Sequence, residues 1–102
     1  MNLVYVPCKD KTEARKIAEN IVRQKLAFCT NIIHSIESLY LWNGKVEKSF
    51  ECLLLVKTSQ ELVDLVINKI KKLHSYKLPV ILSWQIDKTT KEVEKWIKDE
   101  LK

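Results

Sequence analysis

Thiol and imidazole side chains are the groups in this sequence that could bind a metal ion. The 102 residues include three cysteines and two histidines, which are Cys8, Cys29, Cys52, His34 and His74. Thiolate sulfur is a soft ligand that suits copper(I) and zinc, and imidazole suits copper and zinc. The cysteines are 21 and 23 residues apart, whereas a chelating motif places two thiols within a few residues of each other. Any site must therefore be assembled by the fold.

The cysteines also have a simpler interpretation. Free cysteine is among the most buried residue types, so a packing role is favoured for all three. Their odd number, without a close pair, favours reduced thiols. No signal peptide precedes the first apolar run, and we expect a cytoplasmic protein. We expect no membrane partner either, because no apolar run approaches the roughly 20 residues that span a bilayer.

Catalytic and nucleic-acid-binding patterns find little support. The only glycine, Gly44, excludes glycine-rich phosphate loops and dinucleotide fingerprints. The formal net charge of +5 is spread along the chain, and 16 of the 18 basic residues are lysines, whereas base readout usually relies on arginine. We therefore predict neither an enzyme nor a nucleic-acid partner. The basic excess itself has no partner that the sequence identifies.

Hydrophobic periodicity predicts the elements that must position these side chains. The expected elements are a strand at 3–6, a helix capped by Asp10, an extended run at 28–41, a strand at 50–57, a helix capped by Thr58, a strand beginning at Pro79 and a helix capped by Thr89. Asn43-Gly44 predicts a tight hairpin turn. The order is that of an α+β, ferredoxin-like βαββαβ sandwich with an added C-terminal helix, in one domain of residues 1–102.

This plan has a consequence for assembly. Two helices cover one face of a four-stranded sheet, while residues 52–56 are apolar at every position. Solvent on the other face would leave a large apolar patch. We therefore predict self-association through the sheet into a closed, symmetric oligomer.

Four segments together carry a family resemblance. They are residues 27–31 (AFCTN), 39–47 (LYLWNGKVE), 55–58 (LVKT) and 74–79 (HSYKLP). In this order they resemble the CutA (divalent-cation tolerance) family over essentially the whole chain. The resemblance implies a small trimer, similar in fold and assembly to the PII signalling proteins. It also implies copper or another divalent metal ion as ligand, without a required cofactor or an established enzymatic activity.

The resemblance also suggests site residues. The cysteine that some members assign to copper aligns with Val6, and a second histidine ligand aligns with Leu73, so only His74 carries over from that set. Cys29 lies in a matched segment, and a trimer could bring it near another subunit. For His74 the alternatives are a metal ligand, a polar cleft residue, or an imidazolium at a helix C-terminus.

A PII-like sensor is the alternative function. Such a protein would bind a small anionic ligand or a nucleotide in a cleft between subunits. The residues that could line this cleft are Tyr40, Trp42, Lys57 and Tyr76. Packing at a subunit interface is the favoured role for the aromatic side chains among them.

Overall fold

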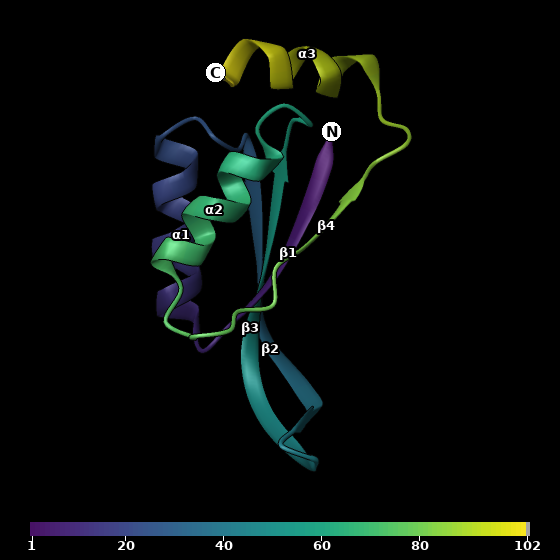
Figure 1. Ribbon diagram of the computed structural model, residues 1–102. Coiled ribbons are helices and arrows are strands. Elements are labelled where there is room, and N and C mark those ends of the chain that lie inside the picture. Colours follow the sequence, from purple (N-terminus) through teal and green to yellow (C-terminus); the bar gives the residue numbers. More distant parts are fainter. Residues whose placement is uncertain (102) are drawn as a thin grey trace.

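The computed structural model describes residues 1–101, which form a four-stranded antiparallel sheet and three helices (Figure 1). The elements are β1 (Asn2–Cys8), α1 (Lys11–Arg23), β2 (Cys29–Trp42), β3 (Lys45–Thr58), α2 (Val63–Leu73), β4 (Leu82–Gln85) and α3 (Lys91–Glu100). The strand order is β2-β3-β1-β4. The predicted element order and the antiparallel sheet are confirmed.

The core lies between the sheet and helices α1 and α2, which cover the same face (Figure 1). Cross-strand pairs of β1 and β3 supply the sheet side of this core, and they are Val4 with Val56, Val6 with Leu54 and Cys8 with Cys52. The helices contribute Ile17, Ile21, Val66 and Ile70, all fully buried. Each such side chain gains about 2 kcal/mol of transfer free energy when it leaves water. The apolar stripes predicted for both helices are thus the ones that the fold buries.

A hairpin arm, which we define as residues 36–51, extends away from the helices (Figure 1). β1 pairs with β3 only from Cys52 to Thr58, so the rest of β3 pairs with β2 alone. At the tip, Asn43 and Gly44 have φ angles of 52° and 77°, the left-handed conformations that the predicted hairpin turn requires. A register shift in β2, between Ile33 and Ile36, marks the start of the arm.

Two predicted helix caps are wrong. The Thr58 hydroxyl is buried at the end of β3 and donates to the Leu26 carbonyl at 2.6 Å, so α2 begins later, with Leu62 at the N-cap. The last helix is capped by Thr90, whose hydroxyl accepts from the Val93 N–H, and not by Thr89. The Thr58 hydroxyl is thus bound to a residue distant in the sequence and cannot cap the helix that follows it. The shift from Thr89 to Thr90 is one residue between two chemically equal caps.

The fourth strand begins at Leu82 and not at Pro79. Its pairing with β1 stops at Tyr5 opposite Leu82. Two residues further along β1, Pro7 has no N–H to donate, and its carbonyl accepts a hydrogen bond from His74. A histidine side chain therefore occupies the hydrogen-bonding position that a longer β4 would need.

Candidate metal site

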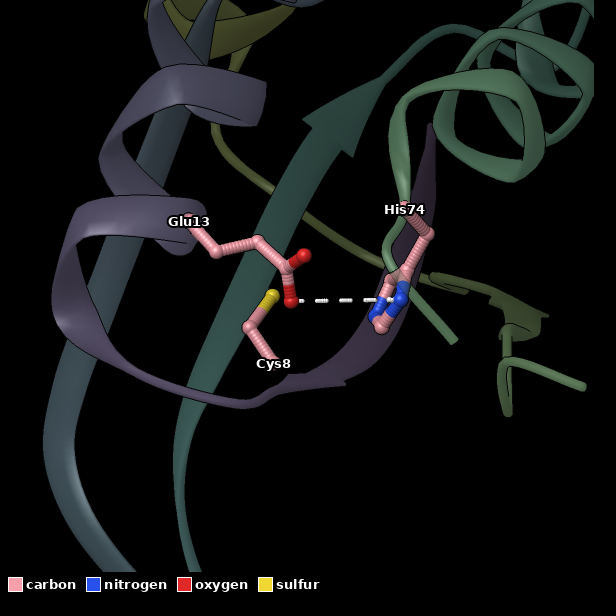
Figure 2. A group of neighbouring side chains, drawn as sticks. All are labelled: Cys8, Glu13 and His74. Atoms are coloured by element: carbon pink, nitrogen blue, oxygen red, sulfur yellow. Dashed lines mark ion pairs between the residues drawn. The ribbon is translucent and has the colours of Figure 1, made fainter. Parts of the chain in front are cut away.

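Three potential metal ligands meet at one end of the sheet (Figure 2). Cys8 is the last residue of β1, Glu13 lies in the first turn of α1, and His74 follows the last residue of α2. One ligand atom from each lies within 4.8 Å of the other two. All three residues are buried, with exposed fractions of 0%, 8% and 8%. We call this group the Cys8–Glu13–His74 site.

The N-terminus of α1 holds Glu13 in place. The Asp10 side chain accepts from the Glu13 N–H at 2.9 Å, as the capping spacing predicts. The Glu13 carboxylate accepts from the Lys9 N–H at 3.1 Å with Oε1 and from the Ser75 N–H at 2.9 Å with Oε2. It therefore joins the loop before α1 to the segment that follows α2.

These hydrogen bonds also set the charge of Glu13. Burial alone raises the pKa of this carboxyl, but the hydrogen bonds from Ser75 and Lys9 favour the ionised form more strongly. The net result is a pKa below the ordinary value of 4.5. Glu13 is therefore an ionised, buried carboxylate at neutral pH.

His74 makes a hydrogen bond with each of its ring nitrogens. The Tyr76 N–H donates to Nδ1 at 3.1 Å, and Nε2 lies 2.8 Å from the Pro7 carbonyl oxygen. Since Nδ1 accepts, we infer that the proton is on Nε2 and that the imidazole is neutral. The dashed line in Figure 2 joins Nδ1 to Glu13 Oε1 over 3.9 Å. Nδ1 is thus the ring nitrogen that faces the carboxylate.

Cys8 is fully buried. Its thiol lies 3.6 Å from the Val6 carbonyl oxygen, to which it can donate only a weak hydrogen bond. Burial, followed by the charge of Glu13, raises the pKa of Cys8 to about 12. The group is therefore a thiol at neutral pH, and a metal ion must displace its proton to bind.

The donor set fits a borderline or soft cation. Thiolate, imidazole and carboxylate together are typical of zinc and copper sites, and hard cations such as Mg²⁺ prefer oxygen ligands alone. In the arrangement described here, hydrogen bonds already satisfy the imidazole and the carboxylate. A bound ion would have to compete with the Tyr76 N–H for His74 Nδ1 and with the proton of Cys8. The chemistry therefore favours weak binding that releases a proton.

The predicted ligand Cys29 lies elsewhere in the chain. It begins β2, pairs with Lys57 of β3, and its sulfur is 3.9 Å from the Lys57 ammonium. Lys57 is five residues along β3 from Cys52, which pairs with Cys8, so the strand rise separates Cys29 from the site by about 17 Å. One chain does not bring Cys29 to His74. A contact between them across subunits stays a prediction.

The four predicted cleft residues are also dispersed within one chain. The Tyr76 hydroxyl donates to Glu51 Oε2 at 2.8 Å, and burial followed by this hydrogen bond raises the pKa of Tyr76. Tyr40 and Trp42 are exposed on the hairpin arm, and Lys57 is near the opposite end of β3. A cleft built from all four would need a second chain, and it stays a prediction.

Sequence reasoning singled out His74 but not its two neighbours as ligands. Glu13 lies three residues after the Asp10 cap, a spacing that helix capping accounts for without a metal. For Cys8 the sequence favoured a packing role. The available signal was the end-to-start proximity of β1 and α1, which places Cys8 and Glu13 five residues apart around one turn.

Comparison with known proteins identifies relatives along nearly the whole chain. The family model described as CutA1 divalent ion tolerance protein matches residues 2–100. The divalent-cation tolerance protein CutA of Archaeoglobus fulgidus is 36% identical over 96 residues, which are 94% of this chain and 93% of the relative. The protein of the same name from Thermus thermophilus is 35% identical over 97 residues, 95% of this chain and 92% of the relative.

Some relatives are longer than this chain. The chain spans 66% of a CutA homologue from Xenopus laevis and about half of the chloroplastic CutA proteins of rice and Arabidopsis thaliana, at 34–35% identity. Over these relatives the similarity therefore covers only the shared portion.

Solved structures show the same similarity in three dimensions. The periplasmic divalent cation tolerance protein CutA from Archaeoglobus fulgidus superposes with a TM-score of 0.95 at 35% identity, covering 99% of this chain and 98% of that one. The CutA1 structure from Thermus thermophilus gives a TM-score of 0.94 at 32% identity over 100% of both chains. Among the described residues, no helix is long and apolar enough to cross a membrane.

Proposed function

The chain belongs to the CutA1 divalent ion tolerance family, and on that premise we propose that it contributes to cation tolerance by binding copper or another divalent ion directly. The observation that carries the proposal is the Cys8–Glu13–His74 site, in which sulfur, oxygen and nitrogen ligands lie within 4.8 Å of one another. Binding at this site is weak, because the ion replaces a thiol proton and the hydrogen bond from Tyr76.

We further propose that the protein acts as a homotrimer. Large apolar side chains are exposed on the face of the sheet that no helix covers, among them Ile33, Leu82 and Trp84 at 46%, 51% and 45%. On the hairpin arm Leu39, Leu41, Val46 and Phe50 are each more than 60% exposed, and by the register of β3 they lie on the other side of the strand pair from Ile33. Exposed apolar side chains on this scale are typical of a subunit interface. A location in the cytoplasm and a role for Cys29 at an interface stay predictions.

Calorimetric titration of the purified oligomer with Zn²⁺ and, without oxygen, with Cu⁺ tests the metal proposal. We expect one ion per chain, with proton release, and at least tenfold weaker binding after Cys8→Ser or His74→Ala. Cys8→Ser keeps the size of the side chain, so it guards against a His74 variant that fails to fold. His34→Ala is the matched control, because His34 is exposed on β2 and should leave the affinity unchanged.

Two outcomes would contradict the proposal. One is that neither ion binds the wild-type protein, and the other is that Cys8→Ser and His74→Ala both bind with wild-type affinity. Light scattering tests the assembly separately, and a mass of one chain at micromolar concentration would exclude the trimer.

A further inference from the structure

A second cysteine stands directly opposite the one in the site. Cys52 of β3 is the register partner of Cys8 in β1, and both side chains lie on the sheet face that the helices cover. Both are free thiols, and Cys52 is only 4% exposed. Its sulfur donates to the carbonyl oxygen of His34 in β2 at 3.0 Å. The thiol of the site therefore has a second buried thiol across the ladder.

The hydrogen bonding of Pro7 shows which kind of pair the two cysteines form. Pro7 has no N–H to donate to β3. Its carbonyl oxygen accepts from His74 and so points away from β3. Opposite pairs in an antiparallel ladder alternate between hydrogen-bonded and non-hydrogen-bonded. Since Pro7 and Leu53 form a non-hydrogen-bonded pair, Cys8 and Cys52 form a hydrogen-bonded one, with a Cα separation of about 5.5 Å.

This spacing suits a shared metal ion better than a disulfide. Cβ atoms in hydrogen-bonded pairs lie toward the upper end of the 4.5–5.5 Å range, whereas a disulfide needs about 3.5–4.5 Å. Two thiolates on one tetrahedral ion, each with a bond of about 2.3 Å, hold their sulfurs roughly 3.8 Å apart. Two side chains leaning toward each other from the wider pair can reach that separation without a backbone shift.

We propose that Cys52 is a further ligand of the Cys8–Glu13–His74 site and that the site takes a thiophilic cation such as Cd²⁺, Zn²⁺ or Cu⁺. This inference rests on the proposed metal binding. On binding, Cys52 rotates about its Cα–Cβ bond away from the His34 carbonyl, which water can then solvate because His34 is exposed. Each of the two thiols releases one proton and forms one sulfur–metal bond. The resulting two sulfurs, one nitrogen and one oxygen complete a four-coordinate shell.

Titration of the oligomer with Cd²⁺, followed by ultraviolet thiolate-to-cadmium charge-transfer absorbance, tests this inference. We expect a wild-type band with the intensity of two thiolates, and about half of it after Cys52→Ser, with at least tenfold weaker binding. His34→Ala is the control, because only the backbone carbonyl of His34 contacts Cys52, and it should leave the band unchanged. A hundredfold excess of Mg²⁺ should not displace the cadmium, since Mg²⁺ prefers oxygen ligands.

The outcomes separate this inference from the proposal on which it rests. If Cys52→Ser keeps the full wild-type band and affinity while Cys8→Ser loses both, the site binds metal without Cys52 and the inference is wrong. If the wild-type protein shows no band and no heat of binding, the metal site itself is excluded. Loss of half the band in each of the two variants supports both.

Discussion

At the Cys8–Glu13–His74 site, a carboxylate, an imidazole and a thiol are buried, whereas a few residues along β3 the hairpin arm exposes large apolar side chains. Glu13 is 8% exposed, and Leu41 is 74% exposed. Both regions reverse the usual distribution of polar and apolar groups in a globular protein. They are joined by one continuous strand, β3.

The difference lies in where each region finds its partners. Every polar side-chain atom of Glu13 and His74 has a hydrogen-bond partner among the described residues. Among residues 1–101, no side chain covers the apolar side chains of the arm enough to remove them from water. We therefore infer that the site stabilises the fold of one subunit, while the arm is stabilised by another subunit. Variants can test this division.

The largest effect is expected for a charge on the apolar face of the arm. The register places Leu39, Leu41, Val46 and Phe50 on one face of the hairpin. Leu41→Asp would bury a carboxylate in the proposed interface at a cost of about 3 kcal/mol per subunit, which weakens association at least a hundredfold. Light scattering at micromolar concentration should then give the mass of one chain, with unchanged circular dichroism.

Asn68→Asp is the matched control for this variant, because it adds the same charge at an exposed position of α2. It should leave the oligomer intact. A Leu41→Asp protein that keeps the wild-type mass would show that the arm is not an interface, and the contrast between the two regions would then need another explanation.

A smaller effect, confined to the subunit, is expected for Glu13→Ala. The change leaves the Lys9 and Ser75 N–H groups without their acceptor, and two such losses cost about 3 kcal/mol of unfolding free energy. Guanidinium unfolding at a fixed chain concentration measures the loss. Glu13→Gln keeps one acceptor oxygen and should lose about half as much. If Glu13→Ala dissociated the oligomer without lowering the unfolding free energy, the inference that the site stabilises a single subunit would be wrong.

The same carboxylate predicts a pH signature. Its pKa in the folded chain is lower than the ordinary 4.5, so the unfolded chain binds the proton more readily. The stabilisation is complete above pH 4.5 and is lost as the pH falls through the lower folded value. In Glu13→Gln this part of the acid destabilisation should be absent, and unfolding curves between neutral pH and pH 3 would reveal it.

The smallest effect is expected where the two regions meet. The Tyr76 hydroxyl donates to Glu51, which lies at the base of the arm and next to Cys52. Tyr76→Phe removes this bond from a half-buried position and should cost about 1 kcal/mol of unfolding free energy without changing the oligomeric mass. Thermal unfolding compared with Tyr5→Phe, for which no hydroxyl hydrogen bond is found among the described residues, would distinguish the bond from the loss of a hydroxyl in general.

The parts of the fold that depend on neighbouring residues were predictable from the sequence. The Asp10 cap needs only Glu13 three residues later, and the hairpin turn needs only Asn43-Gly44. Thr58 failed as a cap because its hydroxyl binds Leu26, which lies 32 residues away in the chain. Hydrophobic periodicity describes the spacing of neighbouring residues and cannot reveal a hydrogen bond between residues so far apart in the sequence.

The site was predictable only in part, because it also depends on contacts between residues far apart in the sequence. The family resemblance singled out His74, whereas the sequence favoured only a packing role for Cys8. What the pattern could not contain is the contact between Glu13 and Ser75, which are 62 residues apart. That contact changes Glu13 from a local capping residue into a member of a metal-binding group.

The projecting hairpin arm also governs how an isolated chain would move in water. The arm stretches the molecule to 46 × 25 × 22 Å and raises its radius of gyration to 14.3 Å, against about 13 Å for a compact domain of this length. A lone subunit would therefore tumble anisotropically, like a short rod, and experience more drag than its mass suggests. Association that folds the arms against neighbouring subunits would produce a rounder particle, with less friction for each chain it contains.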